Sequence, residues 1–179
     1  MNLKNVFLML LLVVMFGCKD EQKNPTVEQD NQEVSAKTFK MTLNAIVKND
    51  DDFCLLYTED GSLNFEKGIW KDVKGNDSEQ DIVFFLPEKI QPSQLRLDLG
   101  KNIEQQDIVV KSIKFEYDGN VREIKGLELG VFFRADASKC TFDYSTGLVK
   151  ALIVQGVKQA PSLYPHETVQ SVELPKLYQ

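Results

Sequence analysis

The sequence predicts an all-β protein, an antiparallel β-sandwich, and two observations carry this prediction. Apolar side chains alternate with polar ones over short stretches such as 39–47 and 95–99, the pattern of half-buried strands. Turn signals such as Asp60-Gly61 and Asp118-Gly119 separate these stretches, and Asp-Gly is a strong hairpin signal. Many short strands with such turns are typical of a sandwich, and the long connections favour a jelly-roll topology over a closed barrel.

The individual strands follow from the same alternation. We expect them at 39–47, 53–57, 82–86, 95–99, 108–117, 121–125, 127–134, 140–145, 148–155 and 168–174. Within 108–117 the alternation changes phase near Lys111-Ser112, which predicts a β-bulge. A helix is hard to place, apart from a turn near 161–166.

The chain divides into three parts. Residues 1–17 have the layout of a secretory signal, with Lys4 near the start and an apolar run of about eleven residues from Val6 to Phe16, shorter than a bilayer span. Residues 18–37 are polar and predict a flexible linker. Residues 38–179 are enough chain for one β-sandwich domain with a substantial core.

The signal ends in VMFGC at 14–18, which resembles the lipobox of bacterial lipoproteins, although Phe16 is bulkier than usual there. The resemblance implies cleavage before Cys18 and lipidation of Cys18 by two or three acyl chains, which hold a membrane far more firmly than one chain. The alternative is an ordinary cleaved signal in which Cys18 is incidental. Lys19-Asp20-Glu21 looks like the surface-export signal of Bacteroidetes-type lipoproteins. It implies an outer-membrane protein facing the cell surface, with the periplasm-facing leaflet as the alternative.

Acidic residues outnumber basic ones, 27 to 21. Removal of residues 1–17 takes away only Lys4 among the charged residues, so 27 acids remain against 20 bases, a balance of −7. Such a surface repels nucleic acid and anionic lipid headgroups, and no patch rich in Lys or Arg interrupts it. Nucleic acid is therefore disfavoured as a partner.

Two cysteines, Cys54 and Cys140, remain once Cys18 is lipidated. Outside the cytoplasm such a pair can persist as a disulfide. The alternative is two separate buried thiols on different strands. Neither cysteine has a histidine beside it in the sequence, so neither is a promising nucleophile.

A recurring strand cadence runs from Ile69 to Phe115. It reads IWKDVKG at 69–75, DIVFFLP at 81–87, LRLDLG at 95–100 and IVVKSIKF at 108–115. This resembles the jelly-roll domains, often similar to carbohydrate-binding modules, of cell-envelope and polysaccharide-related proteins in Bacteroidetes. The likeness covers about a third of the predicted domain and implies a sugar-facing accessory role.

Trp70 is the first candidate for ligand binding. It is the only tryptophan, and an exposed indole is a good platform for the C–H face of a sugar ring; the alternative is an aromatic packed in the core or at its rim. Tyr57 is a possible companion, as are four further aromatic residues: Phe65, Tyr117, Tyr144 and Tyr164. If Leu95, Leu97 and Leu99 point inward, Arg96 and Asp98 share the outward face. They would then bind sugar hydroxyls or form an ordinary surface ion pair.

Other chemistry finds less support. Asp50, Asp51 and Asp52 could hold a structural Ca²⁺ ion, but their spacing does not match an EF-hand loop, and a solvated acidic turn is the alternative. His166 is the only histidine, so a zinc site is a poor fit, and no Gly-x-Ser-x-Gly elbow occurs. We expect no catalytic residue and no other cofactor.

Two functions therefore remain, and the sequence does not separate them. The first is a non-catalytic binding module of a cell-envelope lipoprotein, which contacts glycan. The second is a structural or assembly lipoprotein that binds another envelope protein. A glycan-active enzyme is a distant third, because no pair of carboxylates stands out among the acidic residues.

Overall fold

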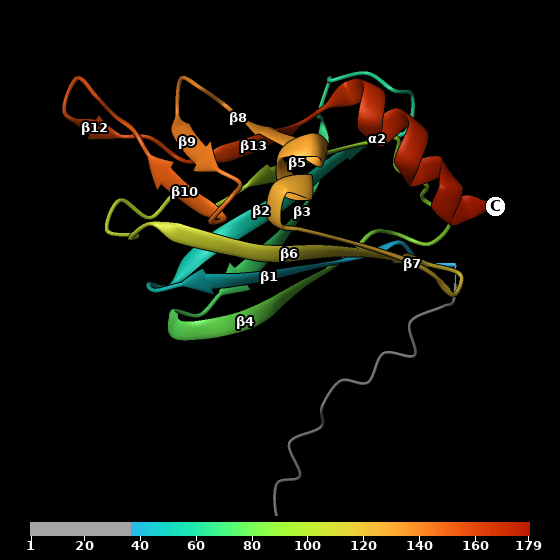
Figure 1. Ribbon diagram of the computed structural model, residues 1–179, viewed down its shortest axis with the longest axis horizontal. Coiled ribbons are helices and arrows are strands. Elements are labelled where there is room, and N and C mark those ends of the chain that lie inside the picture. Colours follow the sequence, from blue (N-terminus) through green and yellow to red (C-terminus); the bar gives the residue numbers. More distant parts are fainter. Residues whose placement is uncertain (1–36) are drawn as a thin grey trace, which may run out of the picture. The chain divides into compact units, whose positions relative to one another are not determined.

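Two antiparallel sheets face each other in the computed structural model, which describes residues 37–179 (Figure 1). The predicted signal, Cys18 and residues 19–36 lie outside the described residues. The first sheet contains β1 (Lys40–Val47), β4 (Asn76–Phe85), β6 (Ile108–Tyr117), β7 (Asn120–Lys125), β9 (Cys140–Asp143) and β10 (Leu148–Ala151). The second contains β2 (Asp51–Thr58), β3 (Lys67–Val73), β5 (Gln94–Asp98), β8 (Phe133–Ala135) and β13 (Ser162–Pro165). The prediction of an antiparallel β-sandwich is confirmed.

The chain crosses between the sheets at most connections. The first sheet has the order β4-β1-β6-β10-β9, with β7 paired to β6, and the second has the order β3-β2-β5-β13-β8. A jelly roll is likewise a two-sheet structure, built of two Greek keys, and the jelly-roll topology stays a prediction. In the first sheet β1 lies between β4 and β6. A separate two-stranded ribbon consists of β11 (Ile153–Val154) and β12 (Val157–Lys158).

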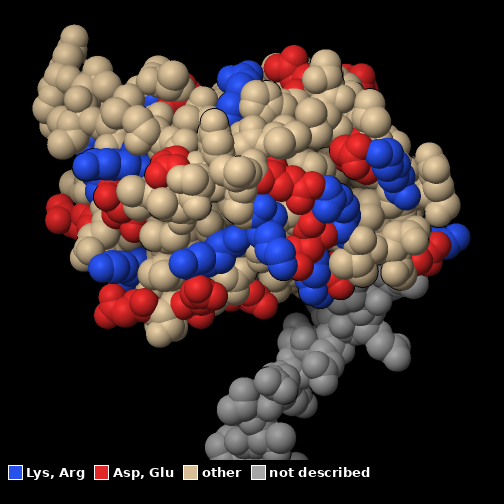
Figure 2. Space-filling model, viewed as in Figure 1, with Lys and Arg blue, Asp and Glu red and all other residues tan. Residues whose placement is uncertain are grey.

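The core lies between the sheets because each strand turns every second side chain inward. Met41 and Leu43 of β1 are fully buried, as are Leu55 of β2 and Leu97 of β5. Burial of each such side chain contributes about 1.5–3 kcal/mol. Among the described residues, the charged side chains other than Asp51 stay outside the core, and Lys, Arg, Asp and Glu are interspersed on the face shown in Figure 2.

Short helices complete the domain. They are η1 (Gly126–Glu128), α1 (Leu129–Phe132), α2 (Glu167–Glu173) and η2 (Leu174–Tyr178). The Gln170 side chain of α2 is fully buried: its oxygen accepts from the Leu95 backbone N–H at 2.7 Å, and its amide donates to the Phe132 carbonyl at 3.1 Å. One polar side chain thus joins α2 to β5 and to α1. Helix α2 lies at one end of the sandwich and the β11–β12 ribbon at the other (Figure 1).

Two local predictions are confirmed. The register between β1 and β6 steps from Asn44↔Ser112 to Ala45↔Val110, so Lys111 is the extra residue of the predicted bulge. Asp118 and Gly119, with φ of 47° and 85°, form the two-residue turn between β6 and β7. Positive φ at both central positions is what a type I′ hairpin needs.

Three predicted elements are wrong. The segment 127–134 is a strand only from Phe133, because Leu129 and Phe132 are buried three residues apart on a helical turn. The segment 168–174 is helix α2 up to Glu173 rather than a strand. The helical turn expected near 161–166 is strand β13. The apolar residues of a short segment can fit the two-residue period of a strand or the 3.6-residue period of a helix, and tertiary packing selects between them.

The turn before β10 gives a test of this packing. Gly147 and Gly156 both have positive φ, 76° and 79°, but a Cβ on Gly147 would lie 1.9 Å from the Val110 carbonyl oxygen, whereas one on Gly156 would meet nothing within 4 Å. We expect Gly156→Ala to lower the free energy of unfolding by about 1–2 kcal/mol through backbone strain alone, and Gly147→Ala to lower it by about 1–3 kcal/mol more through overpacking. Urea denaturation of both variants measures the difference, and equal losses would contradict the close contact.

Candidate binding face

The outward surface of the second sheet brings together four of the residues that the sequence offered as ligand-binding candidates. We call this surface the outer face and define it by Trp70 on β3, Arg96 and Asp98 on β5, and Tyr164 on β13. Cross-strand pairs link Trp70 to Cys54, Cys54 to Asp98, and Asp98 to Ser162. Neighbouring strands are about 4.8 Å apart, so Trp70 and Asp98 stand roughly 10 Å apart on one surface.

Trp70 lies on an edge strand with 62% of its surface exposed. The Lys101 ammonium lies 5.2 Å from the centre of the indole ring, within reach of a cation–π interaction. The same ammonium is 2.8 Å from the Asp52 carboxylate, and Asp52 faces Asp72 across the β2–β3 pair. Asp52, Asp72 and Lys101, but not Trp70 itself, border an open hollow of about 380 Å³. The indole therefore presents an apolar surface beside a polar hollow.

Arg96 and Asp98 form the predicted pair. The guanidinium donates from Nε at 2.8 Å and from Nη2 at 3.0 Å to the two carboxylate oxygens, a bidentate geometry that fixes both side chains. The Arg96 guanidinium also lies 4.6 Å from the centre of the Tyr164 ring, and the guanidinium of Arg134 lies 5.5 Å from the centre of the same ring. Phe65 contacts Tyr164 edge to face, with ring centres 6.3 Å apart. Aromatic rings and charged groups alternate across this face.

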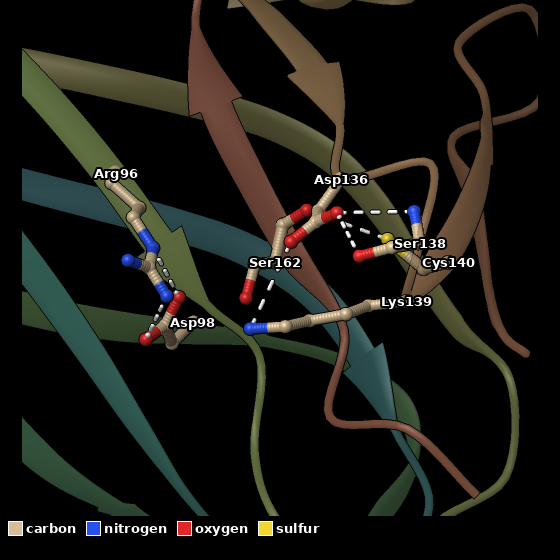
Figure 3. A network of polar contacts seen from close by, with 7 residues as sticks. All are labelled: Arg96, Asp98, Asp136, Ser138, Lys139, Cys140 and Ser162. Atoms are coloured by element: carbon tan, nitrogen blue, oxygen red, sulfur yellow. Dashed lines mark hydrogen bonds and ion pairs between the residues drawn. The ribbon is translucent and has the colours of Figure 1, made fainter. Parts of the chain in front are cut away.

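A loop after β8 borders the outer face on another side (Figure 3). Asp136 accepts from the Ser138 hydroxyl at 2.6 Å and from its backbone N–H at 3.1 Å, and the hydroxyl contact is the main reason why the pKa of Asp136 lies below its usual value. The Lys139 ammonium is 3.8 Å from Asp136 and extends toward the Arg96–Asp98 pair in Figure 3. This loop is therefore preorganised at the rim.

The three aspartates of the acidic cluster 50–52 have different hydrogen-bond and ion-pair partners. Asp51 is largely buried and one of its oxygens accepts from the backbone N–H groups of Lys101 at 2.8 Å and Asn102 at 3.1 Å. Its second oxygen accepts from the Gln105 amide at 3.2 Å. Asp51 thereby ties the β1–β2 turn to the loop that carries Lys101.

The two outer members of the cluster are ion-paired. Asp50 accepts from Lys74 at 2.7 Å and from the Gly75 N–H at 2.8 Å, and the bond from Lys74 is the largest cause of its lowered pKa. The hydrogen bond from Lys101 likewise lowers the pKa of Asp52 and raises that of Lys101. Within residues 37–179 no three Asp, Glu, His or Cys side chains gather closely enough to hold a metal ion. A calcium site at 50–52 stays a prediction, and any such site would compete with these N–H and ammonium donors.

The two cysteines are separate thiols, so the disulfide is not formed. Cys54 lies on β2 and Cys140 on β9, both buried and unpaired. Burial raises the pKa of Cys54 to about 11 and is also the main cause of the raised pKa of Cys140. The Cys140 thiol donates to the Ser162 carbonyl at 3.4 Å.

The remaining aromatic candidates are scattered. Tyr57 points into the core, where it follows Leu55 in the inward row of β2, and is only 5% exposed. It does not join the outer face, and ligand binding by Tyr57 stays a prediction. Tyr117 is also buried, where it contacts Tyr178. Tyr144 is exposed at the β9–β10 turn, away from the outer face.

Several residues of this surface escaped the sequence analysis. Lys101, Asp72 and Arg134 come from three separate segments. The register of β2 with β3 places Asp72, that of β13 with β8 places Arg134, and the hydrogen bonds of Asp51 to the 101–102 backbone place Lys101. The alternation of β5 was a sufficient signal for Arg96 and Asp98, whereas no local pattern places a lysine over an indole.

Comparisons with other proteins add no relationship. No family model, no curated protein and no solved structure matches the chain. Over residues 37–179, none of the helices is long and apolar enough to span a membrane.

The buried position of Asp51 can be tested by an isosteric change. In Asp51→Asn the new amide N–H₂ would face the N–H₂ of Gln105, so that two donors meet. The Gln105 amide cannot simply turn over, because its N–H₂ also donates to the Asn49 carbonyl at 2.8 Å. We expect the free energy of unfolding to fall by about 1–3 kcal/mol, the usual cost of a buried group left without its partner. The control is Asp50→Asn, whose exposed ion pair should matter little. Chemical denaturation of both variants measures this, and an unaffected Asp51→Asn would contradict the bridging role.

Thiol reactivity tests the state of the cysteines. Because a raised pKa leaves a thiol protonated and burial blocks access, we expect a chain with Cys18→Ser to react with neither iodoacetamide nor Ellman's reagent at pH 8 when folded. Both thiols should react after denaturation without a reductant. A mass of the unreduced protein two hydrogens lower would instead reveal a disulfide.

Proposed function

We propose that the protein is a non-catalytic, lipid-anchored binding module that binds a neutral glycan on the outer face. The observation that carries this proposal is Trp70, a largely exposed indole beside a polar hollow on a strand that the sheet holds firmly. A solvent-exposed tryptophan leaves apolar surface in contact with water, which is unfavourable. A ligand with an apolar face covers that surface and removes the unfavourable contact.

Sugar chemistry fits the groups around this indole. A pyranose presents C–H groups on one face and hydroxyls around its edge, and sites for such ligands combine aromatic surface with a few fixed polar groups. Asp52, Asp72 and Lys101 supply donors and acceptors next to Trp70. Arg96 and Asp98 supply a second polar group farther along the face, with the Tyr164 ring adjacent. This arrangement suits a ligand of two or more sugar units.

The ion pairs favour binding over catalysis. A glycosidase needs a carboxyl group whose raised pKa keeps it protonated as a general acid near neutral pH. At this face Lys101 lowers the pKa of Asp52, and Lys74 lowers that of Asp50. Asp98 is held in a bidentate pair with Arg96. Paired cations also balance the acids, which favours an uncharged ligand over an acidic polysaccharide.

The alternative, an assembly protein that pairs a sheet edge with a partner, has less support. The edge strands β8 and β9 have only three and four residues. The longer edges carry charges, Lys67, Lys71 and Asp72 on β3 and Asp77, Glu79 and Asp81 on β4. Short or charged edges are the features that deter strand addition.

The proposed address comes from the sequence. Acyl chains on Cys18 would hold the protein in the outer membrane, and the segment after Cys18 favours display at the cell surface. A module that captures glycan there would act on polysaccharide outside the cell. The alternative address is the periplasm-facing leaflet.

Substitution of Trp70 tests the glycan proposal. On an array of neutral oligosaccharides we expect the protein to bind, and Trp70→Ala to weaken that binding at least tenfold, equivalent to about 1.4 kcal/mol, because the stacking surface is lost. Trp70→Phe should retain part of the affinity. Tyr144→Ala is the matched control, since it removes an exposed aromatic ring elsewhere.

Two outcomes would overturn the proposal. Glycan binding that survives Trp70→Ala with unchanged affinity places the site elsewhere. If the intact protein binds no glycan while its thermal unfolding shows it to be folded, the assembly role becomes the better explanation.

A further inference from the structure

The β11–β12 ribbon projects from the end of the sandwich opposite α2 (Figure 1). Gln155 and Gly156, both with positive φ, form its tight turn. The base of the ribbon is fixed to the body of the domain, because the Leu152 N–H donates to the Lys139 carbonyl at 2.8 Å and the Gln159 N–H donates back to the Leu152 carbonyl at 2.9 Å. The tip is thus a rigidly mounted projection.

Both faces of this projection are apolar. Ile153, Val154 and Val157 are 73%, 44% and 61% exposed. Successive residues of a strand point to opposite faces, so Ile153 and Val154 lie on different sides of the ribbon. No charged residue occurs from 151 to 157, and Figure 2 shows an uncharged projection where Figure 1 places β12.

The surroundings extend this apolar end. Lys158 donates from Nζ to the Ile103 carbonyl at 3.2 Å and also contacts the Gln105 carbonyl, which brings the loop of Ile103 to the base of the ribbon. The Ile103 side chain is 68% exposed. Lys150 is exposed on β10, two residues before Leu152. An aliphatic tip with a lysine near its base matches the order of acyl chains and phosphate groups in a lipid surface.

Because both faces of the tip are apolar, a lipid surface is a better binding partner for it than a protein. A protein partner that docks on one face of the ribbon leaves the other apolar face in water, whereas lipid surrounds the tip and covers both faces at once. A two-stranded ribbon keeps unpaired backbone groups at its edges, and these cannot enter the hydrocarbon core without water. We propose that the β11–β12 ribbon inserts its tip shallowly into a phospholipid bilayer, at the boundary between headgroups and acyl chains.

The segment between Cys18 and the domain is long enough for the ribbon to reach the same membrane to which lipid on Cys18 would anchor the protein. Strand β1 starts at the end of the sandwich away from the ribbon (Figure 1). Nineteen peptide units separate Cys18 from Lys37, and at about 3.3–3.6 Å per residue they reach at most roughly 65 Å. A ten-residue strand such as β6 is only about 33 Å long. The ribbon proposal needs neither the anchor nor glycan binding.

Depth-sensitive fluorescence tests the proposal on the full chain. In a full-length chain with Cys18→Ser, an environment-sensitive NBD label is attached to Val154→Cys, or to Val172→Cys as the matched control, because Val172 is a comparably exposed valine (57%) on α2. The buried thiols of Cys54 and Cys140 are common to both proteins. Each protein is mixed with vesicles of phosphatidylethanolamine and phosphatidylcholine, which carry no net charge, with and without nitroxide-labelled lipid.

We expect a blue shift and at least twofold nitroxide quenching at position 154, and neither at position 172. Addition of Val157→Asp to the Val154→Cys protein should return the label to water, because a carboxylate at the tip resists insertion. A label at 154 that stays in water with vesicles present overturns the proposal. A blue shift without quenching also overturns it and assigns the tip to a protein contact.

Discussion

Each strand of this sandwich buries one row of side chains against the opposite sheet, and this requirement governs the rest of the structure. The inward rows of β1, β2 and β5 are aliphatic and aromatic and lie at or near zero exposure. Once Leu95 and Leu97 point inward, Arg96 and Asp98 must point outward. The same rule turns Tyr57 inward, away from the outer face. The candidate face is therefore the complement of the core.

Polar contacts then fix the loops that surround this face. Asp51 reaches the backbone of the 101–102 segment, and that segment carries the lysine that lies over Trp70. At the other end of the domain, Gln170 joins α2 to the backbone of β5. Buried polar side chains of this kind cost free energy unless they are fully hydrogen-bonded. Here they connect segments 50 or more residues apart in the sequence, so they position the rim as well as stabilise it.

The exposed apolar groups divide into two kinds. Trp70 lies on the outward surface of a sheet and has polar neighbours, the arrangement expected for a ligand with one apolar face and several hydroxyls. The tip of the β11–β12 ribbon is aliphatic on both sides and has no charged residue within it. These differences in shape and polarity lead to different proposed ligands, a glycan for the sheet and lipid for the ribbon. They also imply that the two contacts occur on different parts of the domain and do not compete.

The sequence by itself determined the strand-rich class, the bulge at Lys111, the turn at Asp118-Gly119 and the outward direction of Arg96 and Asp98. All four depend on local geometry, the two-residue period of a strand or the backbone freedom of glycine. The tertiary structure alone decided that 129–132 and 167–173 are helical, since short apolar patterns fit both periods until a neighbouring surface selects one. It alone kept Cys54 and Cys140 apart and placed Lys101 beside Trp70. Such contacts depend on which strands become neighbours, and the order of strands in a sheet is set by the packing of the whole chain.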